Sequence, residues 1–148
     1  MELLRLLLGA GADKDVQDHH HSTALLLACE TNRLDMVHLL LTCGAGIDIC
    51  GHYHRTALMS ACEKGHIGIV RFLLDAEAAM NLQDLEDSTA LMLACGEGHV
   101  EIVKLLLEAG ADRHLEDLSG NTALAIARAA GSEEIVDLLS PTWLDSME

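Results

Sequence analysis

Apolar residues recur along the chain in a block that repeats every 33 residues. Each block opens with Thr-Ala-Leu and carries a further Ala three residues after the Leu. The four copies run from Thr23 to Ala28, Thr56 to Ala61, Thr89 to Ala94 and Thr122 to Ala127. A fixed period of this length is the signature of supersecondary units stacked on one another. The hydrophobic pattern therefore predicts a solenoid.

Each period predicts two short helices. The threonine at the head of the block has the position of an N-cap, where its hydroxyl accepts from the first free N–H groups of a helix. In the first full unit, Leu25 then faces inward and Asn32 ends the helix by tolerating left-handed dihedral angles, a role that Gly takes in later copies. A second helix is expected over about residues 34–43, with Val37 and Leu40 facing the core.

A glycine and a crossing segment complete the unit. Gly44 is expected to end the second helix, and residues 47–55 to cross to the next unit as an extended, hairpin-like turn. Two antiparallel helices with a projecting turn, at this period, resemble the ankyrin repeat. The resemblance implies an all-α ankyrin-repeat solenoid of stacked helix-turn-helix units with projecting β-hairpin-like fingers.

The predicted organisation is one ankyrin-repeat domain over residues 1–140. A half repeat at 1–18 is followed by repeats at 19–51, 52–84, 85–117 and 118–140, and then by a C-terminal tail at 141–148. We expect Pro141 to stop the last helix and Trp143 to fold back onto the last helix pair.

The N-terminal end has the sequence pattern of the second helix of a repeat, and the first helix of that repeat is missing. The leucines Leu3, Leu4 and Leu7 then have nothing packed before them, whereas a solenoid needs a polar outer cap. We expect either that the chain is a piece of a longer array, or that this end binds something or self-associates. No secretory signal is expected, because acidic Glu2 precedes the leucines and no cleavage site follows.

Departures from the family pattern carry information. Ankyrin units usually read Thr-Pro-Leu-His, but Ala replaces Pro throughout, and the histidine is replaced by Leu26, Met59, Met92 and Ala125. Losing that histidine is expected to remove the family's Thr-His hydrogen bond. The two methionines are either core filler or an adaptable binding strip. Glu77 stands in a column of glycines, so it must adopt a left-handed conformation or reshape its turn.

Composition and charge narrow the function classes. The chain has 148 residues, half of them apolar, with one Trp, one Tyr and one Phe, and no apolar stretch that would insert into a membrane. Nine basic and 24 acidic residues give a net charge of −15, which disfavours nucleic acid and favours a protein or peptide partner that is basic. Alternatively, the acids only keep the outer helix faces soluble.

Cysteine usage points to a reducing compartment. Three of the five cysteines, Cys29, Cys62 and Cys95, share one column and are interpreted as small core residues. Packed helices lie roughly 8 to 10 Å apart, too far for a disulfide along this column. An odd number of unpaired cysteines favours a cytoplasmic or nuclear location.

Histidines gather on the first two fingers. If the fingers are extended, residues two apart point the same way, so side chains of neighbouring fingers could meet. The candidate metal ligands are His19, His21, Cys50, His52 and His54. Their spacing matches no established zinc module, so we expect no metal or cofactor. The alternative function that they leave open is a metal- or pH-modulated binder that acts through residues 19–21 and 52–54.

The resemblance places partner binding on the finger tips and the adjoining ends of the first helices. The finger positions are His19, His20, Ser22, His52, Tyr53, Arg55, Leu85, Glu86, Ser88, Leu118, Ser119 and Asn121, and the helix ends add Glu30, Thr31, Glu63, Lys64 and Glu97. Tyr53 is the best single anchor, since tyrosine offers apolar area and a hydroxyl, although it could also be an ordinary exposed turn residue.

The expected function is a protein-protein interaction module or scaffold that presents a concave, acidic groove to a partner. An enzyme is not expected, because the sequence carries no Gly-rich phosphate loop and no triad spacing, and so thin an array encloses no cleft.

Overall fold

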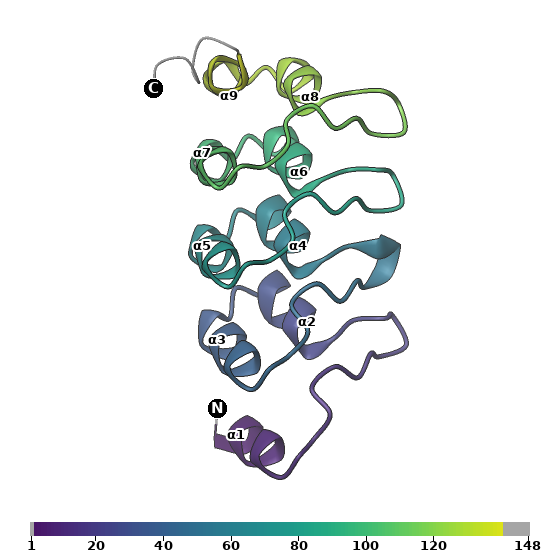
Figure 1. The fold of residues 1–148 in the computed structure, drawn as a ribbon, viewed down its shortest axis with the longest axis vertical. Coiled ribbons are helices and arrows are strands. Elements are labelled where there is room, and N and C mark those ends of the chain that lie inside the picture. The colour runs from purple at the N-terminus through teal and green to yellow at the C-terminus, as the bar shows by residue number, and fades with distance from the viewer. Residues whose placement is uncertain (1, 141–148) are drawn as a thin grey trace.

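Two columns of short helices make up the structure, a computed structural model that describes residues 2–140 (Figure 1). Within those residues the elements are α1 (Glu2–Gly9), α2 (Ala24–Glu30), α3 (Leu34–Thr42), the 3₁₀ turn η1 (His52–His54), α4 (Ala57–Lys64), α5 (Ile67–Asp75), α6 (Ala90–Gly96), α7 (Val100–Glu108), α8 (Ala123–Ala129) and α9 (Glu133–Leu139). Helices α2, α4, α6 and α8 stack beside the projecting fingers, and α1, α3, α5, α7 and α9 form the other column. The predicted all-α solenoid is confirmed.

The threonine of each block begins the first helix of its unit, as predicted. The hydroxyl of Thr23 accepts from the backbone N–H of Leu26 at 3.3 Å, and the other three threonines make the same contact. Each hydroxyl therefore satisfies one backbone donor that the first turn of a helix leaves free.

The two methionines are core residues, one of the two roles expected for them, and they also contact the threonines of their blocks. In place of the family's histidine, the Sδ atoms of Met59 and Met92 accept from the backbone N–H groups of Thr56 and Thr89, both at 3.4 Å. These two side chains are 1% and 2% exposed, so they belong to the core and form no binding strip. The loss of histidine is thus partly compensated by sulfur, a weak acceptor, in the two middle repeats.

Small side chains let the first helices approach one another. The alanine that closes each block, such as Ala61, is buried, and so are Cys29, Cys62 and Cys95 in the next column. All five cysteines are free thiols. Burial raises the pKa of Cys29 and of Cys95 to about 12, which keeps these thiols protonated and unreactive. This column is structural.

Polar ladders tie each repeat to the next. The Oδ1 atoms of Asp15, Asp48 and Asn81, one repeat apart, accept from backbone N–H groups 31 residues further on, at 2.8 to 3.0 Å. The Nε2 atoms of His66 and His99 lie 3.2 and 3.0 Å from the carbonyl oxygens of Glu30 and Glu63 in the preceding repeat. Backbone groups that the short helices leave unpaired are thereby satisfied across the repeat boundary.

The N-terminal helix is the least buried α-helix of the described residues. None of its residues from Glu2 to Gly9 is buried, and Leu3, Leu6 and Leu7 are exposed. Self-association through this end stays a prediction. The expected stop at Pro141 and packing of Trp143 lie outside the described residues. Among the helices of residues 2–140, none has the length and apolar character needed to cross a membrane.

Glu77 adopts a left-handed conformation, which is the first of the two outcomes expected from the sequence. Its φ is 60°, in the column where Gly44 and Gly110 have φ of 81° and 89°. A residue with a Cβ atom is strained there by roughly 1–2 kcal/mol.

Replacing this residue by glycine should stabilise the protein. We expect Glu77→Gly to raise the free energy of unfolding by about 0.5–1 kcal/mol, because the strain released exceeds the entropy that glycine adds to the unfolded chain. Urea denaturation measures the change. The matched control is Gly110→Ala, which should lower the free energy of unfolding, since no atom lies within 4 Å of the added Cβ and only the φ opposes it. An unchanged or lowered stability of Glu77→Gly would contradict the argument.

Candidate functional site

Each finger is a tight hairpin closed by one backbone bond. The N–H groups of Asp18, Gly51, Asp84 and Asp117 donate to the carbonyl oxygen four residues later, at 2.8 to 3.1 Å. Within the described residues the only backbone pairing with the character of a β-bridge joins Glu116 to Thr122. The tip of each finger is therefore a three-residue turn, which agrees with the hairpin-like fingers predicted above.

An aspartate organises three of the four tips. The Oδ1 atoms of Asp18, Asp84 and Asp117 each accept from the N–H groups two and four residues on, at 2.8 to 2.9 Å. These bonds to the charged form lower the pKa of Asp18 and of Asp117 below the ordinary value. The carboxylate thus fixes the turn in the first, third and fourth fingers.

The second finger lacks this aspartate and has a different tip. Gly51 occupies the position, and the turn becomes η1, in which both Tyr53 and His54 have left-handed φ values of 56° and 61°. In the other fingers only the third tip residue, such as His21, is left-handed. The expectation that these segments are extended, with residues two apart pointing the same way, is therefore wrong at the tips.

Backbone and glutamine bonds join the fingers into one surface. The N–H of Leu85 donates to the carbonyl oxygen of Tyr53, and the N–H of Leu118 to that of Glu86, both at 3.0 Å. Between the first two fingers, the Nε2 of Gln17 donates to the carbonyl oxygens of His21 and Cys50. Gln83 makes the matching pair of bonds between the third and fourth fingers. The tips thus keep fixed positions relative to one another.

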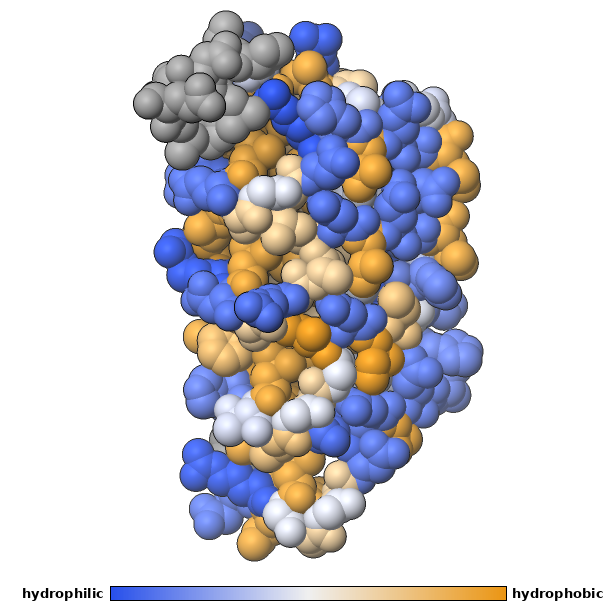
Figure 2. All heavy atoms as spheres, viewed as in Figure 1, coloured by the Kyte–Doolittle hydropathy of each residue, from blue (hydrophilic) through white to orange (hydrophobic). Residues whose placement is uncertain are grey.

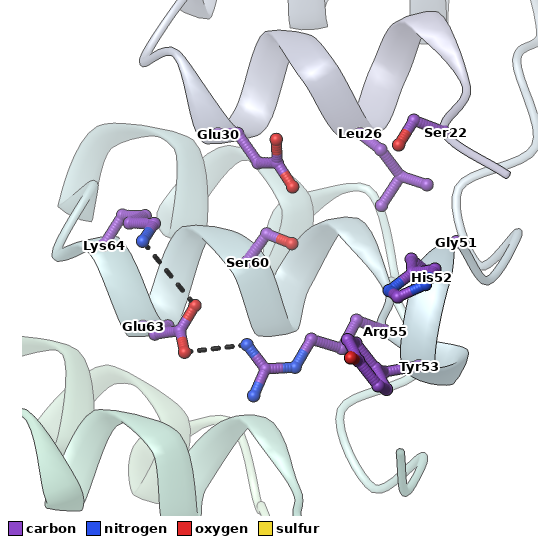
Figure 3. Close-up of a pocket in the computed structure, with 10 residues that line it drawn as sticks. All are labelled: Ser22, Leu26, Glu30, Gly51, His52, Tyr53, Arg55, Ser60, Glu63 and Lys64. Carbon is purple, nitrogen blue, oxygen red and sulfur yellow. Dashed lines mark hydrogen bonds and ion pairs between the residues drawn. The ribbon is translucent and has the colours of Figure 1, made fainter. Parts of the chain in front are cut away.

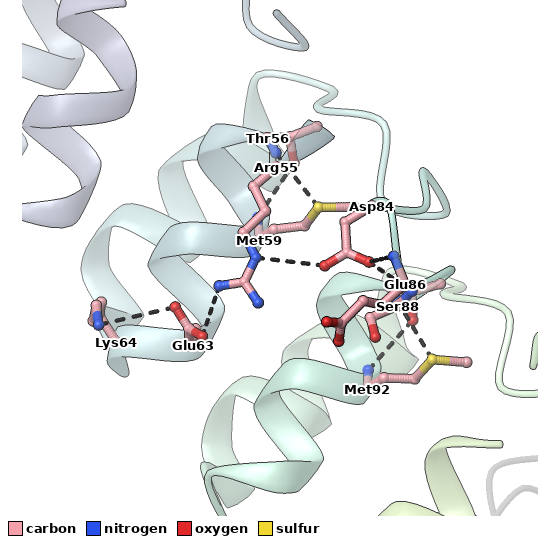
Figure 4. Close-up of polar contacts among 10 residues, drawn as sticks. Arg55, Thr56, Met59, Glu63, Lys64, Asp84, Glu86, Ser88 and Met92 are labelled. Carbon is pink, nitrogen blue, oxygen red and sulfur yellow. Dashed lines mark hydrogen bonds and ion pairs between the residues drawn. The ribbon is translucent and has the colours of Figure 1, made fainter. Parts of the chain in front are cut away.

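Arg55 connects the second finger to both neighbouring elements (Figure 4). Its Nη1 lies 2.7 Å from Oε1 of Glu63 at the end of α4, and its Nε lies 3.4 Å from Oδ2 of Asp84 in the third finger. The first contact is a hydrogen-bonded ion pair, and the second is an ion pair without hydrogen-bond alignment. Burial of the guanidinium opposes its charge, but the two carboxylates outweigh this and raise the pKa of Arg55. Asp84 is itself buried, so this pair is partly withdrawn from solvent.

A hollow of about 190 Å³ lies on the inner face between α2 and α4 (Figure 3). Seven residues predicted for partner binding line it, namely Ser22, Glu30, His52, Tyr53, Arg55, Glu63 and Lys64. Three residues that were not predicted, Leu26, Gly51 and Ser60, complete the lining. The structure therefore brings together the predicted residues of the first two fingers with those of the first helix ends.

The remaining predicted residues lie further along the finger edge and the helix ends. Most of them are exposed, namely His19, His20, Leu85, Glu86, Glu97, Leu118 and Ser119, while Ser88 and Asn121 are half-buried. Tyr53 is 62% exposed, Leu85 59% and Leu118 69%. In Figure 2 the finger edge of the stack is mostly hydrophilic, with hydrophobic surface along its upper part. Large apolar side chains thus stand among polar ones at the tips.

The histidines of the first two fingers do not gather into a cluster of three potential metal ligands among the described residues. Over residues 2–140 no group of three His, Cys, Asp or Glu side chains lies close enough to hold an ion. Instead, the rings of His19 and His20 are tilted relative to one another with their centroids 3.9 Å apart, and His52 lies edge-on to Tyr53 at 4.0 Å. The other candidate ligands, His21, Cys50 and His54, share only a shallow hollow at the finger tips.

The sequence carried a signal for two of the unpredicted residues. Ser60 stands in a column otherwise filled by Leu27, Leu93 and Ile126, and Gly51 stands in the column of finger aspartates. Both exceptions are visible once the repeats are aligned. The contact of Asp84 with Arg55 carries no such signal, because neither residue indicates its partner in another repeat.

A comparison with known families agrees with the repeat geometry. The family model described as Ankyrin repeats (3 copies) matches residues 1–84 and 76–142. The chain belongs to the ankyrin-repeat family. No curated protein matches it significantly. Ankyrin repeats are generally protein-protein interaction modules and are generally non-catalytic.

The Arg55–Asp84 pair should stabilise this ankyrin stack measurably. We expect Asp84→Asn to lower the free energy of unfolding by about 1–2 kcal/mol, because it leaves a partly buried guanidinium short of one carboxylate. Asp18→Asn is the matched control, since Asp18 accepts the same two turn bonds and has no arginine beside it. Urea denaturation of both variants, and of Asp84→Asn in an Arg55→Met background, isolates the pair. Equal losses in all three comparisons would contradict this role.

Proposed function

We propose that this ankyrin-repeat protein is a non-catalytic interaction module that presents a concave, acidic groove to a basic partner protein or peptide. The observation that carries the proposal is the arrangement of the predicted residues along one inner face. The carboxylates Glu30, Glu63 and Glu97 lie at or just after the C-terminal ends of first helices, at the opposite end of these helices from the fingers (Figure 3). A net charge of −15 adds a long-range field that draws basic surfaces toward the protein.

Apolar groups at the finger tips supply contact energy that charge alone does not. Tyr53, Leu85 and Leu118 are exposed on fingers whose positions are fixed by inter-finger hydrogen bonds. Large apolar side chains on a rigid surface lose little entropy on binding and often dominate an interface. This supports a groove in which charge steers the partner and the tip residues hold it.

A pull-down from cell lysate tests the groove. We expect the wild-type chain to retain a partner that is lost by the triple variant Tyr53→Ala, Leu85→Ala and Leu118→Ala. The matched control is Leu34→Ala with Ile67→Ala, which trims exposed apolar residues at the starts of α3 and α5, away from the fingers. Circular dichroism checks that both variants fold.

The control variant should retain the partner, and the wild-type protein should release it as the salt concentration is raised. This pattern is expected if the fingers bind the partner and the negative charge of the protein attracts it. A partner kept by the finger variant and lost by the control would place binding on the opposite face and defeat the proposal.

A second candidate function is pH-modulated binding, favoured by the exposed histidines on the first two fingers. His21, His52 and His54 line a hollow of about 420 Å³ at the tips, and His19 and His20 stand next to the carboxylate of Asp18. The backbone N–H groups of Ser22 and His20 lower the pKa of Asp18, and the nearby imidazoles lower it further. Imidazoles gain positive charge as the pH falls from about 8 to about 5. That charge would reduce the negative potential of the neighbouring groove.

Binding of the captured partner should therefore weaken in acid. We expect a severalfold lower affinity at about pH 5.5 than at about pH 7.5, measured by calorimetry, and a smaller difference in the variant His19→Gln with His20→Gln. The control is His114→Gln, an exposed histidine in a later repeat, which should leave the pH dependence unchanged. Equal affinity at both pH values would remove this second function and leave the first intact.

We also propose a cytoplasmic or nuclear location. The support is chemical, since five free thiols, among them exposed Cys43, persist most readily in a reducing compartment.

A further inference from the structure

Ser60 is a buried polar residue whose hydroxyl is unused by the fold. It is 5% exposed, and its hydroxyl has no hydrogen-bond partner among residues 2–140. Other hydroxyls at or just after the end of a helix behave differently, because those of Thr31, Thr42 and Ser140 donate to the carbonyl oxygen four residues before, at 2.6 to 2.7 Å. The Ser60 hydroxyl is not among the buried polar atoms left without a partner in the described residues, so it is open to the adjoining hollow and free to bond to a ligand there.

The hydroxyl faces the hollow between α2 and α4, which exists because two side chains are small. Ser60 replaces the leucine or isoleucine of the other repeats, and Gly51 replaces the finger aspartate. A Cβ atom at Gly51 would lie 2.7 Å from Cδ1 of Leu26, so a larger residue here would force the Leu26 side chain to shift. We call this space the Ser60 notch, with Ser60 and Leu26 inside it and Gly51, Glu30 and Glu63 around it.

Two carboxylates, Glu30 and Glu63, and two cations, Arg55 and Lys64, line the notch, and among these four only Glu30 has no ion-pair partner within the described residues. Glu63 is already paired, with Arg55 at 2.7 Å and Lys64 at 3.9 Å. Glu30 is exposed and forms no ion pair with any other residue that the structure describes. Figure 3 shows Glu30 and Ser60 facing the same space from α2 and α4. The notch therefore combines a free carboxylate, a free hydroxyl and the apolar side chain of Leu26.

We propose that the Ser60 notch receives one basic side chain, lysine or arginine, of the partner. The aliphatic stem would pack on Leu26, the cationic head would pair with Glu30, and the hydroxyl of Ser60 would accept one of its N–H groups. A cation satisfies the free groups of the notch, because the lining cations Arg55 and Lys64 already pair with Glu63, whereas an acidic side chain would face the unpaired carboxylate of Glu30. This inference rests on the proposed groove function and names the residue type that the groove selects at this point.

Selection from a phage-displayed library of random linear peptides tests the notch directly. We expect peptides enriched on the wild-type protein to share a lysine or an arginine at one fixed place, and the frequency of each tells which head group is preferred. The variant Ser60→Leu restores the side chain of the neighbouring repeats, so it should fold and should not enrich these peptides. Ser60→Ala serves as a second variant, which keeps the space and removes only the hydroxyl.

An affinity cycle with one enriched peptide separates the notch from the general field. Replacing the shared basic residue by norleucine should weaken binding to the wild type about tenfold or more, as expected for a lost charge-assisted bond. The same replacement should cost much less in Ser60→Leu and in Glu30→Gln. The matched control is Glu97→Gln, which changes the net charge equally on another first helix and should keep the full loss.

Three results would overturn the proposed role of the notch, and the first two would leave the proposed groove function in place. The first is enrichment of peptides without a shared basic residue, and the second is equal binding of the enriched peptides by Ser60→Leu and wild type. The third is failure to enrich any peptide. The pull-down with the finger variant tests the groove function separately.

Discussion

Close packing of successive first helices is the constraint on which the rest of the structure depends. Alanine and cysteine in adjacent columns, such as Ala61 and Cys62, leave no exposed surface between helices. Because these side chains are small, each unit follows the last at a nearly constant distance. The polar ladders depend on this constant distance. The oxygens of Asp15, Asp48 and Asn81 each accept from a backbone N–H 31 residues further on, so neighbouring repeats must keep the same spacing for every bond to form. Register in the core thus determines register at the fingers, where partner binding is proposed.

The second finger departs from this regularity, and its departures are connected. Without an aspartate at Gly51, its tip adopts two consecutive left-handed residues, which is uncommon outside glycine. Arg55 in the same finger forms ion pairs both with its own helix α4 and with the next finger. The conformational cost of the tip is therefore offset by ion pairs that hold its base. The Ser60 notch lies beside the same finger, so the irregular part of the stack is also its most chemically distinctive part.

Most of the fold could be predicted from the sequence because the same residue types recur at the same positions of every repeat. Thr23 and its three equivalents marked every helix start, and Asn32 marked a helix end, from local rules alone. The candidate site was predicted only as a surface. The expectation of extended tips is wrong because carboxylate bonds within the finger shape the turn in three of the four fingers. The sulfur acceptor of Met59 and the pairing of Arg55 with Asp84 depend on side-chain positions that no local pattern records.

The notch also determines how a partner could align with the protein. An extended peptide advances about 3.3 Å per residue, and packed helices lie about 8 to 10 Å apart. A peptide that runs along the stack would meet a new repeat at roughly every third residue. Only one first helix, α4, carries serine in the column that holds Leu27, Leu93 and Ile126 elsewhere. A periodic surface alone would accept a peptide in several positions, each shifted by one repeat. The single small side chain of Ser60 makes one repeat different from the others, so it favours one of these positions.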